Sequence, residues 1–269
     1  MLSRLELARK IAVEAGELTL RYFYDLAHLA VERKADESPV TVADRETELL
    51  LRKRIEEQFP EDAVFGEEFP PKSGSSGYQW FLDPIDGTKS FIHGVPLYST
   101  LIGISFSRAA VMPPESVAGV IALPALHELI WAGKEQGAWY ETQRFTEPQR
   151  ARVSQCRNIS EALFLTSEVK TFNKTNRTAA YKNLERSTRL ARTWGDAYGY
   201  AMVATGRADI MVDPALSDWD AGPLQIILEE AGGRFTDWQG NATIFGKEGI
   251  GTNGLLHDAV LEIISRREN

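Results

Sequence analysis

The stretch Tyr78-Gln79-Trp80-Phe81-Leu82-Asp83-Pro84-Ile85-Asp86-Gly87-Thr88 joins an apolar run to two aspartates and a turn. The run Tyr78–Leu82 predicts a strand. Pro84 fixes the backbone behind it, and Asp86 follows Asp83 closely enough for both carboxylates to face one point. If Thr88 begins a helix, the Gly87 and Thr88 amides point at an anion. Carboxylates beside free amides suit a divalent cation that bridges to a phosphate. The alternative, a turn whose aspartate caps a helix, needs only one of the two.

Two weaker acidic clusters accompany this stretch. Gly66-Glu67-Glu68 is typical of a solvated surface pair, although carboxylates beside a loop glycine can also reach a metal. Asp220 precedes the apolar residues Leu224–Leu228, and a plain helix cap explains it as well as a function does. All candidates are carboxylates, and hard oxygen ligands favour Mg²⁺ or Mn²⁺ over zinc. Two cations that share carboxylates are a standard device for transferring phosphate to water.

The residues around these clusters predict a helical and then a largely antiparallel first half, about residues 1–145. Apolar residues at three- and four-residue spacing indicate one helix over Leu5–Tyr22 and another over about Asp44–Gln58, with a polar loop at Lys34–Pro39 between them. Further strands are expected at Thr100–Ser105, Val117–Leu123, Glu128–Ala132 and Ala138–Glu141.

The second half, about residues 146–269, alternates between strands and helices. Strands are expected at Ala162–Thr166, Ala208–Val212 and Arg234–Trp238, and helices at Asn173–Glu185, Asp196–Thr205, Asp220–Ala231 and His257–Arg266. This alternation predicts an α/β half. Because no linker separates the halves, we expect one domain over residues 1–269, of class α/β (α+β).

The composition restricts the partners and the compartment. Hydrophobic residues make up 43% of the 269, enough for a sizeable core, and the net charge of -8 argues against nucleic acid as the main partner. The single cysteine, Cys156, excludes a disulfide within the chain and favours the cytoplasm. We expect Cys156 to be a buried small side chain and not a nucleophile. We see neither a signal peptide nor an apolar stretch long enough to span a membrane.

Taken together, the three acidic clusters resemble the inositol monophosphatase family in order and spacing, over nearly the whole chain. The resemblance implies an αβαβα layered sandwich, usually dimeric, that hydrolyses a small phosphomonoester. It implies two or three Mg²⁺ ions, with Mn²⁺ as a possible substitute. The implied metal ligands are Glu67, Asp83, Asp86, Asp220 and the carbonyl of Ile85.

The resemblance also implies roles around the metals. Asp44 would pair with Thr88 to orient and deprotonate the attacking water, and Glu67 would share in catalysis. The Gly87 and Thr88 amides would hold the phosphate. Arg192, Asp196 and Asp213 would contact the leaving alcohol. Pro223 departs from many members, and we expect it in the first turn of its helix, where proline is tolerated.

Two further runs resemble the histidinol-phosphate phosphatase branch: Lys89-Ser90-Phe91-Ile92-His93-Gly94-Val95-Pro96-Leu97-Tyr98 and Arg192-Thr193-Trp194-Gly195-Asp196-Ala197-Tyr198-Gly199. Asp196 and Asp213 could pair with the substrate ammonium, and Trp194 or Tyr198 could stack on the imidazole or simply pack in the core. We interpret His93 as a structural loop residue near the metal site. The rival substrates are inositol 1-phosphate and a nucleoside or sugar bisphosphate. A rival of another class is a non-catalytic ligand-binding dimer, against which the intact set of acidic residues argues.

Overall fold

Strand β4 (Tyr78–Asp86) lies second in a seven-stranded sheet of order β3-β4-β5-β6-β7-β8-β9. The computed structural model describes residues 1–34, 39–107 and 114–266. Strand β3 runs parallel to β4, and every other neighbouring pair is antiparallel, as the sequence predicts for most of the first half. The other strands are β3 (Ala63–Gly66), β5 (Ser99–Phe106), β6 (Glu115–Leu123), β7 (Glu128–Gly133), β8 (Gly137–Thr142) and β9 (Gln149–Arg150).

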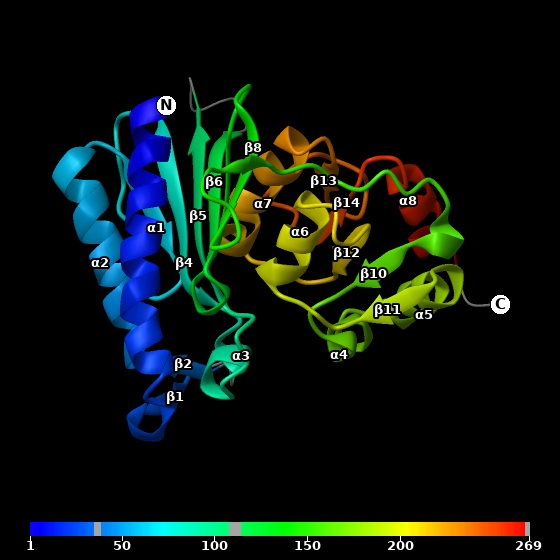
Figure 1. The fold of residues 1–269 in the computed structure, drawn as a ribbon, viewed down its shortest axis with the longest axis horizontal. Coiled ribbons are helices and arrows are strands. Elements are labelled where there is room, and N and C mark those ends of the chain that lie inside the picture. Colours follow the sequence, from blue (N-terminus) through cyan, green and yellow to red (C-terminus); the bar gives the residue numbers. More distant parts are fainter. Residues whose placement is uncertain (35–38, 108–113, 267–269) are drawn as a thin grey trace.

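Helices α1 (Leu2–Phe23) and α2 (Val42–Gln58) cover one face of this sheet (Figure 1). Their apolar stripes meet the sheet in one core cluster, in which Ile11, Leu51 and Trp80 are fully buried. A short antiparallel pair, β1 (Val31–Arg33) and β2 (Pro39–Thr41), joins the two helices. Residues 35–38 of the predicted loop lie outside the described ranges, and its last residue, Pro39, begins β2.

A buried carboxylate fastens α1 to the sheet. The guanidinium of Arg4 donates to both oxygens of Asp62, at 2.7 and 2.8 Å. Ser76 Oγ and Trp80 Nε1 donate to the same carboxylate, at 2.6 and 2.8 Å. Four donors therefore surround a side chain that is almost fully buried.

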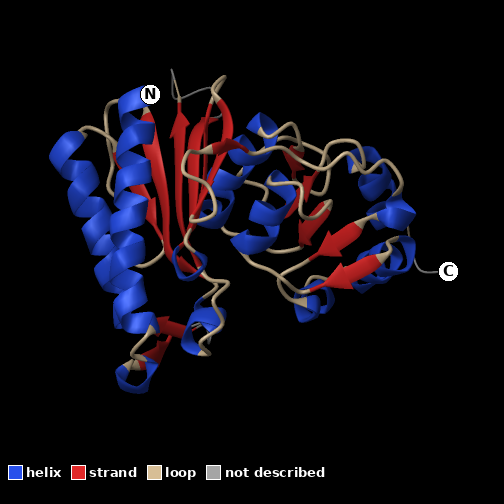
Figure 2. Cartoon of the chain, in the orientation of Figure 1, coloured by secondary structure: helices blue, strands red, loops and turns tan. Residues whose placement is uncertain are grey.

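A second, mixed sheet has the order β11-β10-β12-β14-β13 and forms the other half of the molecule (Figure 2). Strand β10 (Leu163–Leu165) is parallel to β11 (Leu190–Arg192) and to β12 (Ile210–Asp213). Strand β14 (Gly249–Thr252) is antiparallel to β12 and to β13 (Arg234–Thr236). The second half is thus less purely parallel than alternation alone suggests.

Two helices lie between the sheets, and three cover the outer face of the smaller one (Figure 1). The inner pair is α6 (Ala197–Ala204) and α7 (Asp218–Glu230), and the outer set is α4 (Val169–Lys174), α5 (Thr178–Ser187) and α8 (His257–Ser265). The layers run helix, sheet, helix, sheet, helix, which confirms the expected αβαβα sandwich. Among the described residues, no helix combines the length and the apolarity that a membrane span requires.

Helix α7 packs against the larger sheet through glycines. A Cβ added to Gly103 on β5 would come within 2.4 Å of the Gly222 backbone, and one added to Gly119 on β6 within 2.6 Å of the Pro223 carbonyl oxygen. The helix backbone therefore rests almost directly on the sheet, and it carries Asp220 on its first turn.

Three details of the prediction are wrong. The expected helix Asn173–Glu185 is two helices, α4 and α5, separated by a turn in which Asn176 has a φ of 58°. Helix α7 begins at Asp218 and not at Asp220, because Ser217 caps it. Pro223 consequently lies inside the helix, beyond the first turn.

Candidate active site

The end of strand β4 presents two buried aspartates to one pocket. The pairing between β4 and β5 shifts register between Asp83 and Asp86, so the strand bends there. The Ile85 amide donates to Asp83 Oδ1 at 3.0 Å. Gly87 has a φ of 81° and precedes α3 (Thr88–Ile92), so Thr88 does begin a helix, as the sequence predicts. A side chain at Gly87 would also meet Asp196 Oδ2 at 2.8 Å.

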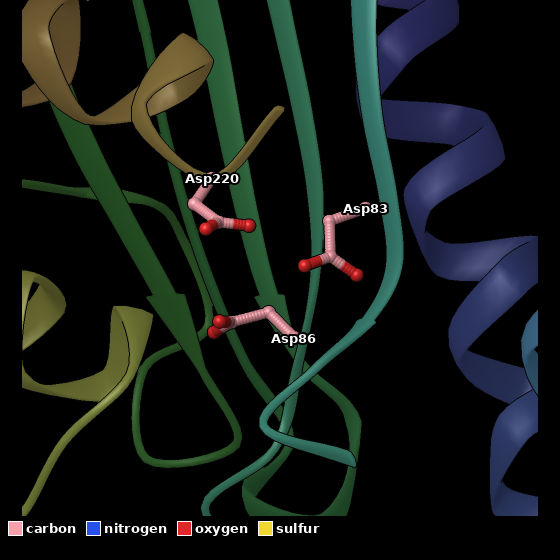
Figure 3. A group of neighbouring side chains, drawn as sticks. All are labelled: Asp83, Asp86 and Asp220. Carbon is pink, nitrogen blue, oxygen red and sulfur yellow. The ribbon is translucent and has the colours of Figure 1, made fainter. Parts of the chain in front are cut away.

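Helix α7 delivers a third carboxylate from the other half of the chain. Asp220 is the third residue of α7, and its Oδ2 accepts a hydrogen bond from the Ser217 amide at 2.9 Å, in a capping box. The same carboxylate therefore caps the helix and faces Asp83 and Asp86 (Figure 3). One oxygen from each of the three lies within 4.8 Å of the others.

This acidic trio, Asp83, Asp86 and Asp220, is electrostatically unfavourable without a cation. Burial, and then the neighbouring carboxylates, raise the pKa of Asp83 and of Asp86 well above their usual range. Burial likewise raises the pKa of Asp220 to about 7. Among the described residues, no lysine or arginine forms an ion pair with the trio. Three converging hard oxygen donors, from two buried aspartates and the half-buried Asp220, fit a divalent cation such as Mg²⁺.

Glu67 lines the same pocket, but its carboxylate forms an ion pair with a lysine. Lys34 Nζ lies 2.5 Å from Glu67 Oε1 and 2.6 Å from Glu68 Oε1. Burial alone would lower the pKa of Lys34, but the two carboxylates hold it above its usual value. Burial raises the pKa of Glu68 to about 7. Lys34 was not among the predicted site residues, because only the fold of β1 brings it here.

These groups line an open pocket of about 480 Å³, together with other atoms of the same loops. Its lining residues are Lys34, Glu67, Asp83, Ile85, Asp86, Gly87, Thr88, Ser217, Trp219 and Asp220. Every predicted metal ligand is therefore at this pocket, and so are both residues predicted to hold phosphate.

The expected partnership of Asp44 with Thr88 is not formed in this structure. Asp44 is 1% exposed, and its Oδ2 accepts from the Thr41 amide at 2.7 Å and from Thr41 Oγ1 at 2.6 Å. Thr88 Oγ1 donates to the Ile85 carbonyl at 3.2 Å. Asp44 is thus the third residue of a capping box at the start of α2.

A second pocket, of about 460 Å³, shares Asp86 and Asp220 with the first. Asp196 forms part of its wall, with an unusual backbone φ of 49°, and its amide donates to Ser167 Oγ at 3.0 Å. Lys89 and Glu168 also line it and form an ion pair of 3.0 Å. The two pockets therefore adjoin at Asp86 and Asp220. Sequence patterns gave no signal for Glu168.

Two predicted substrate residues lie elsewhere. Asp213 is 2% exposed and is absent from the lining of both pockets. Its carboxylate accepts from Thr166 Oγ1 and from the Ser167 amide and hydroxyl, at 2.8 to 3.1 Å. Asp213 therefore fixes Ser167, which in turn holds the amide of Asp196. Arg192 is exposed on the edge strand β11, and its guanidinium donates to the Ala191 carbonyl.

The aromatic and histidine candidates lie in different surroundings. Tyr198 packs against the central core cluster, whereas Trp194 is 39% exposed and lines neither pocket. His93 is exposed just after α3, where its ring contacts the Lys89 carbonyl at 2.7 Å, which agrees with a structural role. Cys156 is only half-buried, but burial raises the pKa of its thiol, which does not favour a nucleophile.

Comparison with known proteins agrees with this geometry. The model of the inositol monophosphatase family matches residues 2–268. A histidinol-phosphatase of Chlorobaculum parvum is 39% identical over 91% of this chain and 90% of its own length. A fructose-1,6-bisphosphatase/inositol-1-monophosphatase of Thermotoga maritima is 32% identical over 98% of this chain and 96% of its own. The solved structure of the extragenic suppressor protein suhB of Bartonella henselae has a TM-score of 0.88 and 26% identity, and covers 99% of this chain and 100% of that one.

Proposed function

Since this chain belongs to the inositol monophosphatase family and is a phosphomonoester hydrolase, we propose that it hydrolyses histidinol phosphate to histidinol and phosphate with Mg²⁺. The observation that carries the hydrolysis is the acidic trio, whose three oxygens converge without a protein counter-ion. The greater identity to a histidinol-phosphatase, 39% against 32% for the inositol-1-monophosphatase relative, supports the substrate.

The metal set is part of this proposal, because the family is metal-dependent but the ion is not fixed by that alone. Glu67, Asp83, Asp86, Asp220 and the carbonyl of Ile85 would hold two or three Mg²⁺ ions, with Mn²⁺ as a substitute. When bound, such ions polarise phosphoryl oxygens and lower the pKa of a water. Glu67 would have to part from Lys34, since one Oε1 now carries the ammonium.

The remaining roles belong to the ends of β4 and α2. The Gly87 and Thr88 amides begin α3 and would hold phosphate oxygens. Thr88 and Asp44 would orient the attacking water and accept its proton. This role requires the Thr88 hydroxyl to turn away from the Ile85 carbonyl, to which it donates here.

The specificity follows from the second pocket. A substrate ammonium group would donate a charge-assisted hydrogen bond to the Asp196 carboxylate, about 1.5–3 kcal/mol when well formed, whereas inositol phosphate offers only hydroxyls. Asp196→Asn should therefore lower kcat/KM for histidinol phosphate about 10-fold or more and leave inositol 1-phosphate nearly unchanged. Asp213→Asn is the matched control, because Asp213 lies behind the pocket and should affect both substrates alike.

The rival substrate has its own observation in its favour, the similarity to the bifunctional Thermotoga maritima enzyme. Equal or greater efficiency with inositol 1-phosphate would assign the chain to that branch. A phosphate-release assay with an EDTA control separates either enzyme from a non-catalytic dimer. Titration calorimetry with Mg²⁺ tests the metal site without relying on turnover, and light scattering in solution tests the homodimer that the family resemblance suggests.

A further inference from the structure

A buried glutamate on α2 grips the loop that carries Glu67. Glu48 lies one helical turn after Asp44 and is fully buried. Its Oε2 accepts from the Glu68 amide at 2.7 Å. The Phe69 amide also donates to this carboxylate. Glu48 thus satisfies consecutive backbone donors directly after Glu67.

Arg52, one further turn along α2, completes the grip. Its Nε donates to Glu48 Oε1 at 2.7 Å, and its NH2 group donates to the Phe69 carbonyl at 3.0 Å. The arginine therefore neutralises the buried carboxylate and holds the loop from its other side. Burying a charge costs desolvation free energy, so buried charges are normally paired and hydrogen-bonded, as the Glu48 carboxylate is.

The backbone is also restrained at Glu67 itself and at Gly66, the residue before it. The Glu67 amide donates to the Leu82 carbonyl of β4 at 3.2 Å. At Gly66, an added Cβ would lie 2.1 Å from Glu48 Oε1, so the loop backbone lies directly against the buried carboxylate. Glu67 is thus held between β4 before it and Glu48 after it.

We propose that Glu48, neutralised by Arg52, is a positioning residue that fixes the Glu67 carboxylate at the corner of the metal site. The inference rests on the proposed function, because it assumes that Glu67 is a metal ligand. Glu48 itself is not among the residues that line the pocket. Its contribution is to hold the Glu67 backbone in place, so that little conformational freedom is lost when the ion binds.

The test is the Mg²⁺ affinity of metal-stripped protein, measured by calorimetry beside the melting temperature without metal. Glu48→Gln keeps the side-chain volume but removes the charge, and we expect the Mg²⁺ dissociation constant to rise about 10-fold, the scale of groups that orient metal ligands. The Mg²⁺ concentration for half-maximal phosphate release should rise in parallel. Glu57→Gln, which removes an exposed glutamate from the same helix, is the control. It should leave unchanged both the Mg²⁺ dissociation constant and the Mg²⁺ concentration for half-maximal phosphate release.

A lower melting temperature with an unchanged Mg²⁺ dissociation constant would reduce Glu48 to a structural residue and overturn the inference. Mg²⁺ titration of Asp83→Asn distinguishes failure of the proposed metal site from failure of the positioning role of Glu48. If Asp83→Asn abolishes Mg²⁺ binding and Glu48→Gln does not weaken it, only the positioning role fails. If Asp83→Asn binds Mg²⁺ normally, the proposed metal site fails and the positioning role fails with it.

A double-mutant cycle tests the contact itself. Gly66→Ala should weaken Mg²⁺ binding about 10-fold, because its methyl group displaces Glu48 or the loop. In a Glu48→Ala background the same change meets no carboxylate and should add less than about 2-fold, since contacting residues are not additive. An equal effect of Gly66→Ala in both backgrounds would contradict the proposal.

Discussion

Buried aspartates in two regions of the molecule face opposite surroundings. Asp62, beneath α1, receives hydrogen bonds from Arg4, Ser76 and Trp80. Burial alone would raise its pKa, but these donors hold the pKa below the usual range. In the acidic trio, burial and the charges of neighbouring carboxylates, Glu67 and Asp196 among them, raise the pKa of each member.

The difference distinguishes a carboxylate that holds the fold together from the carboxylates that we propose bind a metal ion. Asp62 is ionised and fully paired, so removing it breaks the hydrogen bonds that join α1 to the larger sheet. The trio places like charges in a low-dielectric site, which destabilises the protein until a cation arrives. Both regions provide hydrogen-bond donors, and what differs is the charge nearby: Asp62 is paired with the Arg4 guanidinium, whereas the trio has neutral donors and other carboxylates around it.

Asp83→Asn should separate activity from stability most sharply. We expect turnover to fall at least about 100-fold, the scale of several kcal/mol that metal catalysis supplies. The melting temperature without metal should stay the same or rise, because one repelling charge is gone. Steady-state kinetics and thermal melts in EDTA check this. A variant that melts earlier yet keeps its turnover would reverse the comparison.

Asp62→Asn should show the opposite behaviour. Loss of one partner from a buried pair leaves Arg4 without its counter-ion, and we expect the free energy of unfolding to fall by about 3 kcal/mol. The rings of Phe59 and Tyr78, 4.2 and 3.8 Å from the guanidinium carbon, should retain part of the contact. Urea unfolding measures the loss. Turnover per folded molecule should be unchanged, and a loss comparable to that of Asp83→Asn would be inconsistent with a purely structural Asp62.

His257 extends the comparison to a buried base whose ring has two hydroxyl groups as hydrogen-bond partners. Its ring lies between the hydroxyls of Thr236 and Thr252, at 3.0 Å each, and burial lowers its pKa to about 4. Because the unfolded chain binds a proton near pH 6.5 and the folded chain does not, this stability is complete above pH 6.5 and is lost as the pH falls towards 4. We expect a loss of about 2 kcal/mol between pH 6.5 and pH 5, measured by urea unfolding. His257→Gln should remove this slope, whereas His127→Asn, at an exposed position, should preserve it.

Lys34→Gln should give the smallest effect. It removes the cation that pairs with Glu67 and Glu68, so the two glutamates of the metal-free protein lose their counter-ion. We expect the melting temperature without metal to fall slightly and the Mg²⁺ affinity to rise by up to about 10-fold, because Glu67 no longer has to leave a lysine. Calorimetry measures both, with the exposed Lys53→Gln as control. Weaker Mg²⁺ binding would show that Lys34 assists the ion and does not compete with it.

The sequence identified most of the first half because its signals are local. The apolar run before Asp83, the turn at Pro84 and the helix at Thr88 each depend on neighbouring residues, and all three are present in the structure. The order of the acidic clusters indicated that Asp220 joins them, although its spacing alone left a plain cap open. The αβαβα fold class and the phosphatase function followed from the resemblance.

What escaped prediction depends on contacts between distant elements. Lys34 reaches Glu67 only because β1 folds back below α1, and no local pattern encodes that return. Asp213 resembled a substrate ligand by its position in the chain, but Ser167 from another strand end occupies its carboxylate. The strands β3 and β11 are too short for their periodicity to show, and tertiary pairing defines them.

The trio also depends on the order in which the chain is made. Asp83 and Asp86 leave the ribosome long before Asp220, whose place beside them depends on α7 lying against the glycines of β5 and β6. A nascent first half therefore contains two members of the trio but not the third. A truncated chain that has lost α7 keeps Asp83 and Asp86 but lacks Asp220, so its acidic trio is incomplete.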